Sequence, residues 1–424
     1  MTTTRRIAII GANRIPFCRA HTAYKDIGNQ EMMTAALSGL VDRYGLKGEK
    51  LGDVSLGAVI KHTSQWNLAR ESTLGSGLAA ETPAFDIQRA CGTSLESAIL
   101  IGNKIAVGQI EAGIAGGVDT ISDSPIVYPD DYRKLLMKSF RARSTMARLK
   151  PWLGLRPRHF KPETPGVVEP RTGLSMGESC ELMAKEWQIS REAQDELALT
   201  SHQNLARAYD NGFYDGLVSP FMGVKQDNNL RRGSTMEQMA KLKPVFDRSE
   251  DGTLTAGNST PLTDGAGCVL MASEQWAQER GLEVQAYLTY AKVAAVDFVG
   301  GEGLLMAPAY AVSEMLYQAG LQLQDFDLYE IHEAFAAQAL CTLAAWESAD
   351  FCRERLGRSP LGAIDRNKLN VYGGSLASGH PFGATGSRLI GILAKALHST
   401  EARRGLISVC TGGGMGVTAI LEAA

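Results

Sequence analysis

Short apolar stretches alternate with helical periodicity through the first third of the chain. The apolar stretches predict buried strands, and the segments in which apolar residues recur every three or four positions predict helices packed on a sheet. The predicted strands are 6–11, 53–60, 85–90 and 111–122, and the predicted helices are 28–44 and one from the turn at Cys91 to about Ala106. This alternation predicts an α/β layered domain with a mostly parallel sheet, whose functional residues lie at the strand carboxyl ends.

A second unit repeats this order after a long interruption. In residues 85–117 a strand, a glycine-bearing turn, an amphipathic helix and a glycine-ended strand follow one another, and residues 369–416 repeat them. A duplicated layer would place both turns at one shared end of the molecule. We predict an N-terminal domain of residues 1–122 plus 251–279, a loop domain of residues 123–250 and a C-terminal domain of residues 280–424.

Composition and charge narrow the class of protein. The 424 residues carry a formal net charge of −3 and are 44% hydrophobic and 21% charged, which indicates a globular protein and gives no sign of nucleic-acid binding. The seven cysteines are dispersed without CxxC pairs, as is typical of a reducing compartment. No signal peptide and no apolar run of about 18 residues is visible. We expect a cytoplasmic protein.

Cys91 lies in QRACGTS, between a predicted strand and the start of a predicted helix. The dipole and free N–H groups of a helix N-terminus stabilise a thiolate, which lowers the pKa of a thiol. Free cysteine is also among the most buried residue types. By itself, the segment therefore fits a nucleophile and a packed core residue about equally well.

Three further segments carry residues that could act with Cys91. Residues 373–387 surround His380 with five glycines, and a histidine held with so little bulk around it suits a general base for a thiol. Cys410 precedes three glycines whose N–H groups could form an oxyanion hole. His332 opens an alanine-rich predicted helix, where a lone histidine is more often structural.

Other sites could use the same residue types. Two cysteines and two histidines could bind zinc, but they come from four distant segments without the usual short spacings, so no metal is expected. The glycines around His380 do not have the spacing of a phosphate-binding P-loop. A papain-like hydrolase needs only cysteine and histidine, and it would not require a second cysteine or duplicated layers.

Five blocks of the chain resemble blocks of the thiolase family. The nucleophile turn of the family resembles residues 91–94 (CGTS), and its N/H-E-A-F block resembles residues 332–335 (HEAF). Its G-H-P-x-G-A-T/S-G and C-x-G-G-G-x-G blocks resemble residues 379–386 and 410–416. The segment that leads back from the insertion resembles residues 255–267 (TAGNSTPLTDGAG). The blocks follow the family order and cover essentially the whole chain.

The resemblance implies an α/β thiolase fold, in which two duplicated βαβαβαββ-type halves form a five-layered core and a loop domain binds coenzyme A. It implies that Cys91 is the acyl-accepting nucleophile, that His380 is the base which activates it, and that Cys410 is the second acid/base. Backbone N–H groups of Cys91 and Gly412 would form one oxyanion hole. His380 and a water held by His332 would form the other.

The implied reaction is CoA-dependent cleavage of a 3-ketoacyl-CoA to acetyl-CoA and a shortened acyl-CoA, or the reverse Claisen condensation. Coenzyme A is then a substrate, and no cofactor is expected. Met176, Thr260 and Phe335 are expected to contact the substrate.

His332 stands where many thiolases have asparagine. The β chains of fatty-acid oxidation complexes resemble this sequence there and in residues 227–246, which favours a degradative β-oxidation enzyme with a broad chain-length range. A short-chain acetoacetyl-CoA thiolase in a biosynthetic role is the alternative, and Cys410 argues against a ketoacyl-synthase-like enzyme. Intact catalytic blocks disfavour a non-catalytic acyl-CoA carrier. A protonated His332 would be the stronger oxyanion donor and would titrate near a pKa of roughly 6.5.

Residues 131–161 of the insertion contain ten Lys or Arg and one acidic residue. They could form a solvated face, contact the phosphates of CoA, or lie on a membrane surface through the apolar residues between them. We favour CoA binding for a few of them. The resemblance also implies a homodimer or homotetramer, formed through the sheet edge near Cys91, and allows a hydratase/dehydrogenase chain as partner.

Overall fold

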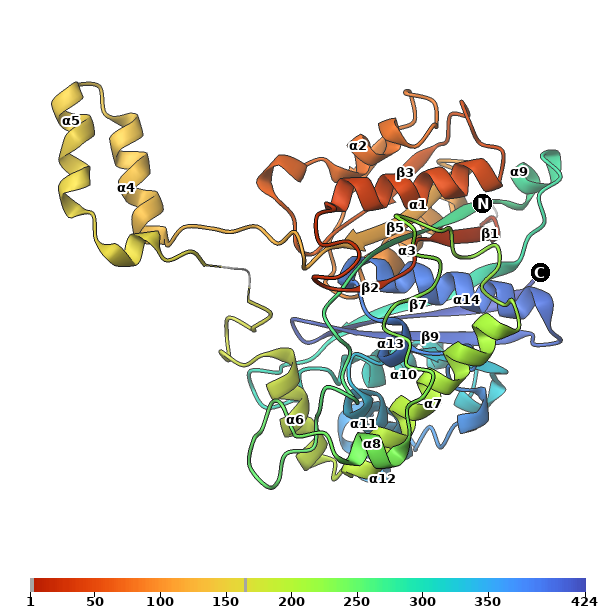
Figure 1. Cartoon of the computed structure of the whole chain (residues 1–424). Coiled ribbons are helices and arrows are strands. Elements are labelled where there is room, and N and C mark those ends of the chain that lie inside the picture. Colours follow the sequence, from red (N-terminus) through yellow and green to blue (C-terminus); the bar gives the residue numbers. More distant parts are fainter. Residues whose placement is uncertain (1–3, 164–165) are drawn as a thin grey trace.

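A sheet of ten strands runs through the molecule. The computed structural model describes residues 4–163 and 166–424. One half of the sheet contains β1 (Ile7–Arg14), β2 (Cys18–Arg19), β3 (Asp53–Leu56), β4 (Ala84–Asp86), β5 (Ala112–Asp119) and β6 (Thr263–Ser273). The other half contains β7 (Ala286–Ala295), β8 (Leu328–Ile331), β9 (Arg404–Thr411) and β10 (Met415–Ala423). The halves join where residues 7–9 of β1 pair with residues 286–288 of β7, and they stack one above the other (Figure 1).

Helices cover both outer faces of the stacked halves and fill the space between them. Helices α1 (Asn29–Arg43) and α2 (Leu68–Gly75) pack on the N-terminal half, and α10 (Ala307–Ala319) and α11 (Ala336–Glu347) lie beyond the C-terminal half (Figure 1). Helices α3 (Thr93–Ala106) and α14 (Thr385–Ser399) pack against each other in the middle, where apolar residues of both halves form one buried core. The five-layered α/β core is confirmed.

The two halves repeat one order of elements. The first is β1-α1-β3-α2-β4-α3-β5-β6, apart from the short β2, which is the predicted βαβαβαββ order. In the second, β7, α10, β8 and α11 are followed by α14, β9 and β10, and the third strand is reduced to an isolated bridge between Leu369 and Tyr329. Helices α3 and α14 therefore occupy equivalent places, and so do the turns before them at Cys91 and His380.

The expectation of a mostly parallel sheet is wrong. Strand β3 pairs in parallel with β4 and β5, and β8 pairs in parallel with β9, but every pairing along β5-β6-β1-β7-β10-β9 is antiparallel. The cause lies in the connections, because β6 returns from a long insertion rather than from a helical crossover. Strands β9 and β10 are joined by the short turn Gly412–Gly414, and φ of +77° at Gly413 and +68° at Gly414 favours glycine there.

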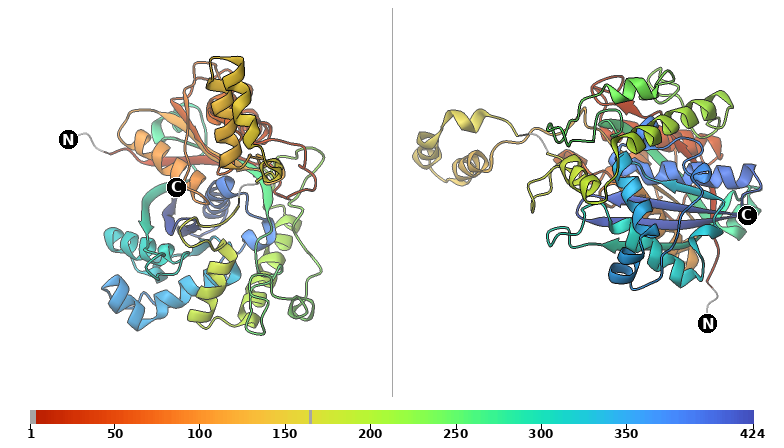
Figure 2. Two further views of the ribbon diagram at one scale, coloured as in Figure 1. Left: turned by 90° about the vertical axis from the view of Figure 1, so that its left-hand side faces the viewer. Right: turned by 90° about the horizontal axis from the view of Figure 1, so that it is seen from below.

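The insertion between β5 and β6 is helical and in two parts. Helices α6 (Met176–Glu186), α7 (Arg191–Asp210) and α8 (Met236–Ala240) lie against the body near α11 and α13 (Ser375–Ser378). Helices α4 (Asp130–Arg141) and α5 (Thr145–Leu149) and the 3-10 turns 150–154 and 157–160 form a hairpin that projects from the body (Figures 1 and 2). The remaining short helices are α9 (Glu274–Glu279) and α12 (Ala349–Phe351). No helix in the described part of the chain is long and apolar enough to cross a membrane.

Candidate active site

Four segments that are far apart in the sequence line one cavity of about 550 Å³. Cys91, His380, Cys410 and Gly412 all contribute to its wall. Met176, Thr260 and Phe335, which the sequence predicts as substrate contacts, line the same cavity. A concave, largely apolar site with a few convergent polar groups is what a small-molecule site requires.

Cys91 is presented by a strained turn before α3. The preceding Ala90 has φ of +41°, which is uncommon for a residue other than glycine and is typical of backbone held for function. A Cβ atom on Gly92 would lie 2.8 Å from Val417 Cγ2, so only glycine lets the turn pack against β10.

The Cys91 thiol is protonated at rest. Its side chain is half-buried, and burial raises the pKa of the Cys91 thiol to about 12, although the N–H of Gly412 acts in the opposite direction. Of the two opposing effects on the Cys91 pKa, burial outweighs the N–H groups at the helix start. Attack by Cys91 therefore needs a base that removes the proton.

His380 is oriented as such a base. Its Nδ1 lies 2.6 Å from Thr385 Oγ1 and its backbone N–H donates to Thr263 Oγ1 at 3.1 Å, while its Nε2 atom is buried and has no partner among the described residues. Burial lowers the pKa of His380 to about 3. The ring is therefore neutral and can accept a proton. Gly379, with φ of +97°, has no room for a Cβ beside Thr263, which explains the glycine.

His332 lies directly behind His380. The two ring centroids are 4.1 Å apart, His332 Nδ1 lies 2.7 Å from Ser375 Oγ, and its buried Nε2 also finds no partner in residues 4–163 and 166–424. Burial, with smaller effects of His380 and Arg388, lowers the pKa of His332 well below its usual value. The expectation that a protonated His332 titrates near pH 6 to 7 is therefore wrong, and any hydrogen bond that it donates comes from a neutral ring.

Cys410 is the penultimate residue of β9 and lines the same cavity. It is buried, and burial together with the nearby Cys91 raises the pKa of its thiol well above the usual value. The glycine turn after it directs the Gly412 N–H toward Cys91. A protonated thiol in this position can donate a proton, and its thiolate form can accept one.

Two carboxylates that no motif indicated hold these turns. Glu169 of the insertion accepts the N–H of Gly413 at 2.6 Å. Buried Asp119, at the end of β5, accepts the N–H groups of Val59, Ile60 and Gly383 at 2.6–3.1 Å. The only sequence signal for Asp119 was its position at a strand carboxyl end. Both residues hold backbone segments that border the cavity.

Comparison with known proteins identifies the family. Residues 7–275 match the model of the thiolase N-terminal domain, and residues 282–423 match that of the thiolase C-terminal domain. The chain belongs to the thiolase family. The 3-ketoacyl-CoA thiolases of Yersinia enterocolitica and Yersinia pestis are each 40% identical to it over 98% of this chain and 97% of their own.

Solved thiolase structures share the fold over the whole chain. The acetyl-CoA acetyltransferase of Bacillus anthracis superposes with a TM-score of 0.83 at 29% identity, covering 100% of both chains. Human mitochondrial 3-ketoacyl-CoA thiolase in complex with CoA superposes with a TM-score of 0.81 at 29% identity, covering 99% of this chain and 98% of that chain. The predicted thiolase family and fold are confirmed.

Two arginines, Arg19 and Arg231, line a cavity next to the catalytic one. A smaller cavity of about 200 Å³ shares Phe246, Thr260 and Pro261 with the catalytic one, and Arg19 and Arg231 line it. The ten Lys and Arg of residues 131–161 instead lie on or beside the hairpin that projects from the body (Figure 1).

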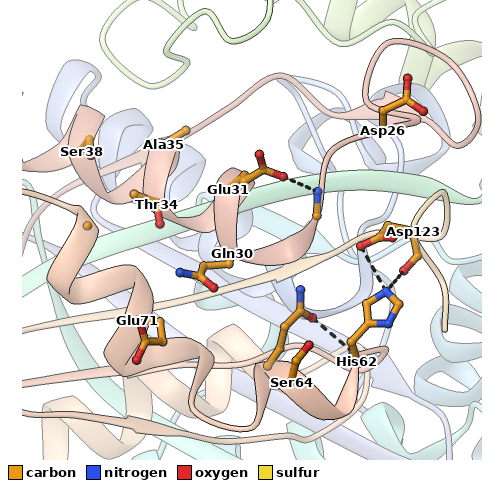
Figure 3. Close-up of a pocket in the computed structure, with 13 residues that line it drawn as sticks. Asp26, Gln30, Glu31, Thr34, Ala35, Ser38, His62, Ser64, Glu71 and Asp123 are labelled. Atoms are coloured by element: carbon orange, nitrogen blue, oxygen red, sulfur yellow. Dashed lines mark hydrogen bonds and ion pairs between the residues drawn. The ribbon is translucent and has the colours of Figure 1, made fainter.

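A larger hollow of about 870 Å³ lies on the outside of the N-terminal half, at the start of α1 (Figure 3). Asp26, Glu31, Glu71 and Asp123 line it, and His62 Nε2 lies 2.9 Å from the backbone oxygen of Asp123. None of the thiolase blocks contributes to this hollow. Size therefore does not identify the active site here, whereas the convergence of nucleophile, base and acid does.

Proposed function

We propose that this thiolase cleaves 3-ketoacyl-CoA with coenzyme A to acetyl-CoA and a shortened acyl-CoA, and that it also runs the reverse condensation. The observation that carries the proposal is the meeting of Cys91, His380 and Cys410 in one cavity with the Gly412 N–H. The names of relatives that are 40% identical over nearly the full length support the same substrate class.

The proposed cycle begins with transfer of the Cys91 proton to Nε2 of His380. The Cys91 sulfur then bonds to the 3-keto carbon, and the bond between the second and third carbons breaks with its electron pair remaining on the second carbon. Cys410 protonates that carbon, and acetyl-CoA leaves. The thiol of a second CoA attacks the acyl-Cys91 thioester, which releases the shortened acyl-CoA and returns the proton to Cys91. The CoA thiol proton passes to Cys410.

Each addition step places negative charge on a carbonyl oxygen. The N–H groups of Cys91 and Gly412 are proposed to bind the oxygen of the acyl thioester, and the Nε2 atoms of His380 and His332, the latter directly or through water, to bind the other oxygen. Removal of one such donor typically costs about 10²–10³ in rate. Two oxyanion sites are needed because two different carbonyls become charged.

Coenzyme A acts as a substrate in this scheme, and no separate cofactor is proposed. Its pantetheine arm would run from Cys91 past Thr260 into the smaller cavity, where Arg19 and Arg231 can meet phosphate charge. The shared wall of Phe246, Thr260 and Pro261 supports this path. Arginine suits phosphate recognition because its planar fork gives two parallel hydrogen bonds.

The test is a chain-length profile of CoA-dependent cleavage, followed at the enolate absorption of 3-ketoacyl-CoA. A degradative enzyme of broad range should cleave medium and long chains with kcat/KM comparable to that for acetoacetyl-CoA. Activity on acetoacetyl-CoA alone would support the short-chain biosynthetic alternative, and no thiolysis of any chain length would refute the proposal.

Covalent catalysis is tested separately. After incubation with acetyl-CoA and an acid quench, mass spectrometry should find the acetyl group on the peptide that contains Cys91. Acetyl found on the Cys410 peptide instead would reverse the assigned roles.

We further propose a homodimer or homotetramer in a reducing cytoplasm, with a hydratase/dehydrogenase chain as partner. Seven free cysteines support the reducing compartment.

We also propose that the projecting hairpin, residues 130–160, contacts an anionic membrane surface. Phe140, Met146 and Leu153 are 82%, 77% and 89% exposed, and the ten Lys and Arg of residues 131–161 are interleaved with them along the chain. Such interleaving of apolar and cationic groups is typical of interfacial segments.

Co-sedimentation with vesicles rich in phosphatidylglycerol, but not with pure phosphatidylcholine, is expected. The double change Phe140→Ser and Leu153→Ser should abolish it, whereas Trp66→Ser on the body should not; absence of binding by the unchanged protein would refute the contact.

A further inference from the structure

The hydrogen bonds behind the two active-site histidines differ in direction. His380 Nδ1 and His332 Nδ1 each meet a hydroxyl group, that of Thr385 at 2.6 Å and that of Ser375 at 2.7 Å. Both Nε2 atoms are directed away from these hydroxyls and are buried. A neutral imidazole carries its proton on one nitrogen only, so each hydroxyl decides which nitrogen that is.

Thr385 already has an acceptor for its hydroxyl hydrogen. Its Oγ1 lies 3.1 Å from the carbonyl oxygen of Pro381, one turn earlier, and donates to it. The oxygen of Thr385 is then free to accept from His380. Nδ1 of His380 therefore carries the proton, and Nε2 presents a lone pair to the cavity.

Ser375 is in the opposite situation. Its Oγ lies 2.8 Å from Nη2 of Arg388, and a guanidinium can only donate. The hydroxyl hydrogen of Ser375 needs an acceptor, and His332 Nδ1 is the one that the described residues provide. If His332 Nδ1 carried the proton instead, Ser375 would face two donors and its own hydrogen would remain unpaired in a buried site, which native structures avoid.

We propose that His380 and His332 are held in opposite tautomers, His380 with a proton on Nδ1 and His332 with a proton on Nε2, and that Ser375 and Arg388 are the positioning residues for His332. The assignment rests on the hydrogen-bond network and deepens the roles proposed above. His380 then enters the cycle as an acceptor for the Cys91 proton, while His332 is a permanent donor. The two rings, 4.1 Å apart, supply a base and an oxyanion donor without competing for one proton.

The positive charge of Arg388 affects how readily either histidine ring takes up a second proton. It is buried, and its charge disfavours a second proton on either ring. When the Cys91 proton arrives, the ring with the open lone pair toward the cavity receives it, and that ring is His380. The charge of Arg388 opposes this step too, so the protonated His380 is poised to give the proton back when CoA attacks.

Neutron diffraction from crystals of the perdeuterated enzyme tests the tautomers directly. Deuterium is expected on Nδ1 of His380 and on Nε2 of His332. Deuterium on Nδ1 of His332, or on Nε2 of His380 in the resting enzyme, would overturn the proposal. This readout does not depend on turnover, so it stands apart from a failure of the proposed thiolytic activity.

Two variants separate the two tautomers in function. Ser375→Ala should lower kcat for thiolysis roughly tenfold, with KM for CoA within about twofold and with the rate of Cys91 alkylation by iodoacetamide unchanged, because only the donor is affected. Thr385→Val should instead slow the alkylation of Cys91, since the acceptor form of His380 is no longer fixed.

The matched control is Ser378→Ala. Ser378 lies in the same short helix and is equally buried, and among residues 4–163 and 166–424 its hydroxyl bonds only to the backbone oxygens of Gly374 and Gly379. Its loss should leave both rates unchanged. Equal kcat values for Ser375→Ala and Ser378→Ala would refute the role of Ser375, and restoration of kcat by Ser375→Thr would support it.

Discussion

Two thiols with raised pKa values, those of Cys91 and Cys410, line one cavity together with His380. Cys410 remains a thiol at rest, which is the form that can protonate a carbanion. In Cys410→Ala, acetyl-CoA should still acetylate Cys91, but the methyl protons of acetyl-CoA should no longer exchange with solvent deuterium. NMR of acetyl-CoA in D₂O measures the exchange. Normal exchange in this variant would remove Cys410 from the mechanism.

Glu330 on β8 makes the stability of the protein depend on pH. Its side chain is buried, one carboxylate oxygen has no partner among the described residues, and burial raises the pKa of Glu330 to about 8, although Arg388 opposes the shift. The folded state holds this proton more tightly than the unfolded chain does. The stability that this proton contributes is therefore fully present below pH 4.5 and is lost as pH rises through 8, by on the order of 5 kcal/mol in total.

Glu330→Gln imitates the protonated form and should remove this loss. Its free energy of unfolding should match that of the unchanged protein at pH 5 and exceed it at pH 8.5, as measured by urea unfolding. Glu401→Gln, at an exposed position, is the control and should follow the unchanged protein at both pH values. An identical pH dependence for Glu330→Gln would contradict the assignment.

The residues that could be predicted from the sequence are those in local turns. Cys91, His380 and Cys410 each stand beside glycines that shape their own turn, so a short stretch of sequence identifies them. Glu169 and Gly413 are 244 positions apart, and Asp119 and Gly383 are 264 apart. No local pattern encodes such pairs, and their contacts arise only when the halves stack. The same holds for the neutral state of His332, which depends on burial.

At the scale of elements, the loop domain contributes one carboxylate, Glu169, to the cavity in addition to apolar wall residues such as Met176 and Phe246. Glu169 reaches from the insertion to the turn between β9 and β10 and accepts the N–H of Gly413, next to the N–H that faces Cys91. Glu169→Ala should loosen this turn and lower kcat/KM about tenfold. The effect should be smaller than the loss of about 10²–10³ that follows removal of an oxyanion donor, because the Gly412 N–H remains present. Steady-state thiolysis measures the effect.

The matched variants for Glu169 test hydrogen bonding against charge. Glu169→Gln keeps an oxygen acceptor and should remain near full activity. Glu186→Ala removes an equal charge from an exposed position of α6 and should have no effect. If Glu169→Gln were as impaired as Glu169→Ala, the carboxylate charge rather than the hydrogen bond would be the contribution of the loop domain.

The order of elements also shows where sequence patterns lose information. Alternating strands and helices predicted the layers correctly, because each helix buries its apolar face locally. They did not predict the antiparallel centre of the sheet, because β6 is separated from β5 by the whole insertion and its direction depends on where that insertion returns. The third strand of the second half is reduced to one bridge at Leu369. The sequence pattern predicted two equivalent halves and did not predict this difference between them.

At the scale of the whole molecule, the two ends of the sheet differ. Strand β8 is largely buried, and its outer side meets Leu369. Strand β4 pairs with β3 alone in the described part of the chain, and Phe85 and Ile87 at this edge are half-buried. An open edge with apolar side chains invites pairing with another chain. The turn with Cys91 follows β4 directly, so a second copy at this edge would also brace the nucleophile.

We therefore predict at least a homodimer through the β4 edge, with a mass by light scattering of at least twice 45.6 kDa. Gln88 is exposed just beyond β4 and would lie near the axis between the two copies. In a Cys91→Ser background, which removes the one cysteine that is not fully buried, Gln88→Cys should be cross-linked into dimers by a short bis-maleimide. Glu401→Cys, at an exposed position after α14 that is not part of the β4 edge, should not. A monomer with full activity would refute the dimer, and a dimer in which only Glu401→Cys cross-links would show that the chains meet elsewhere.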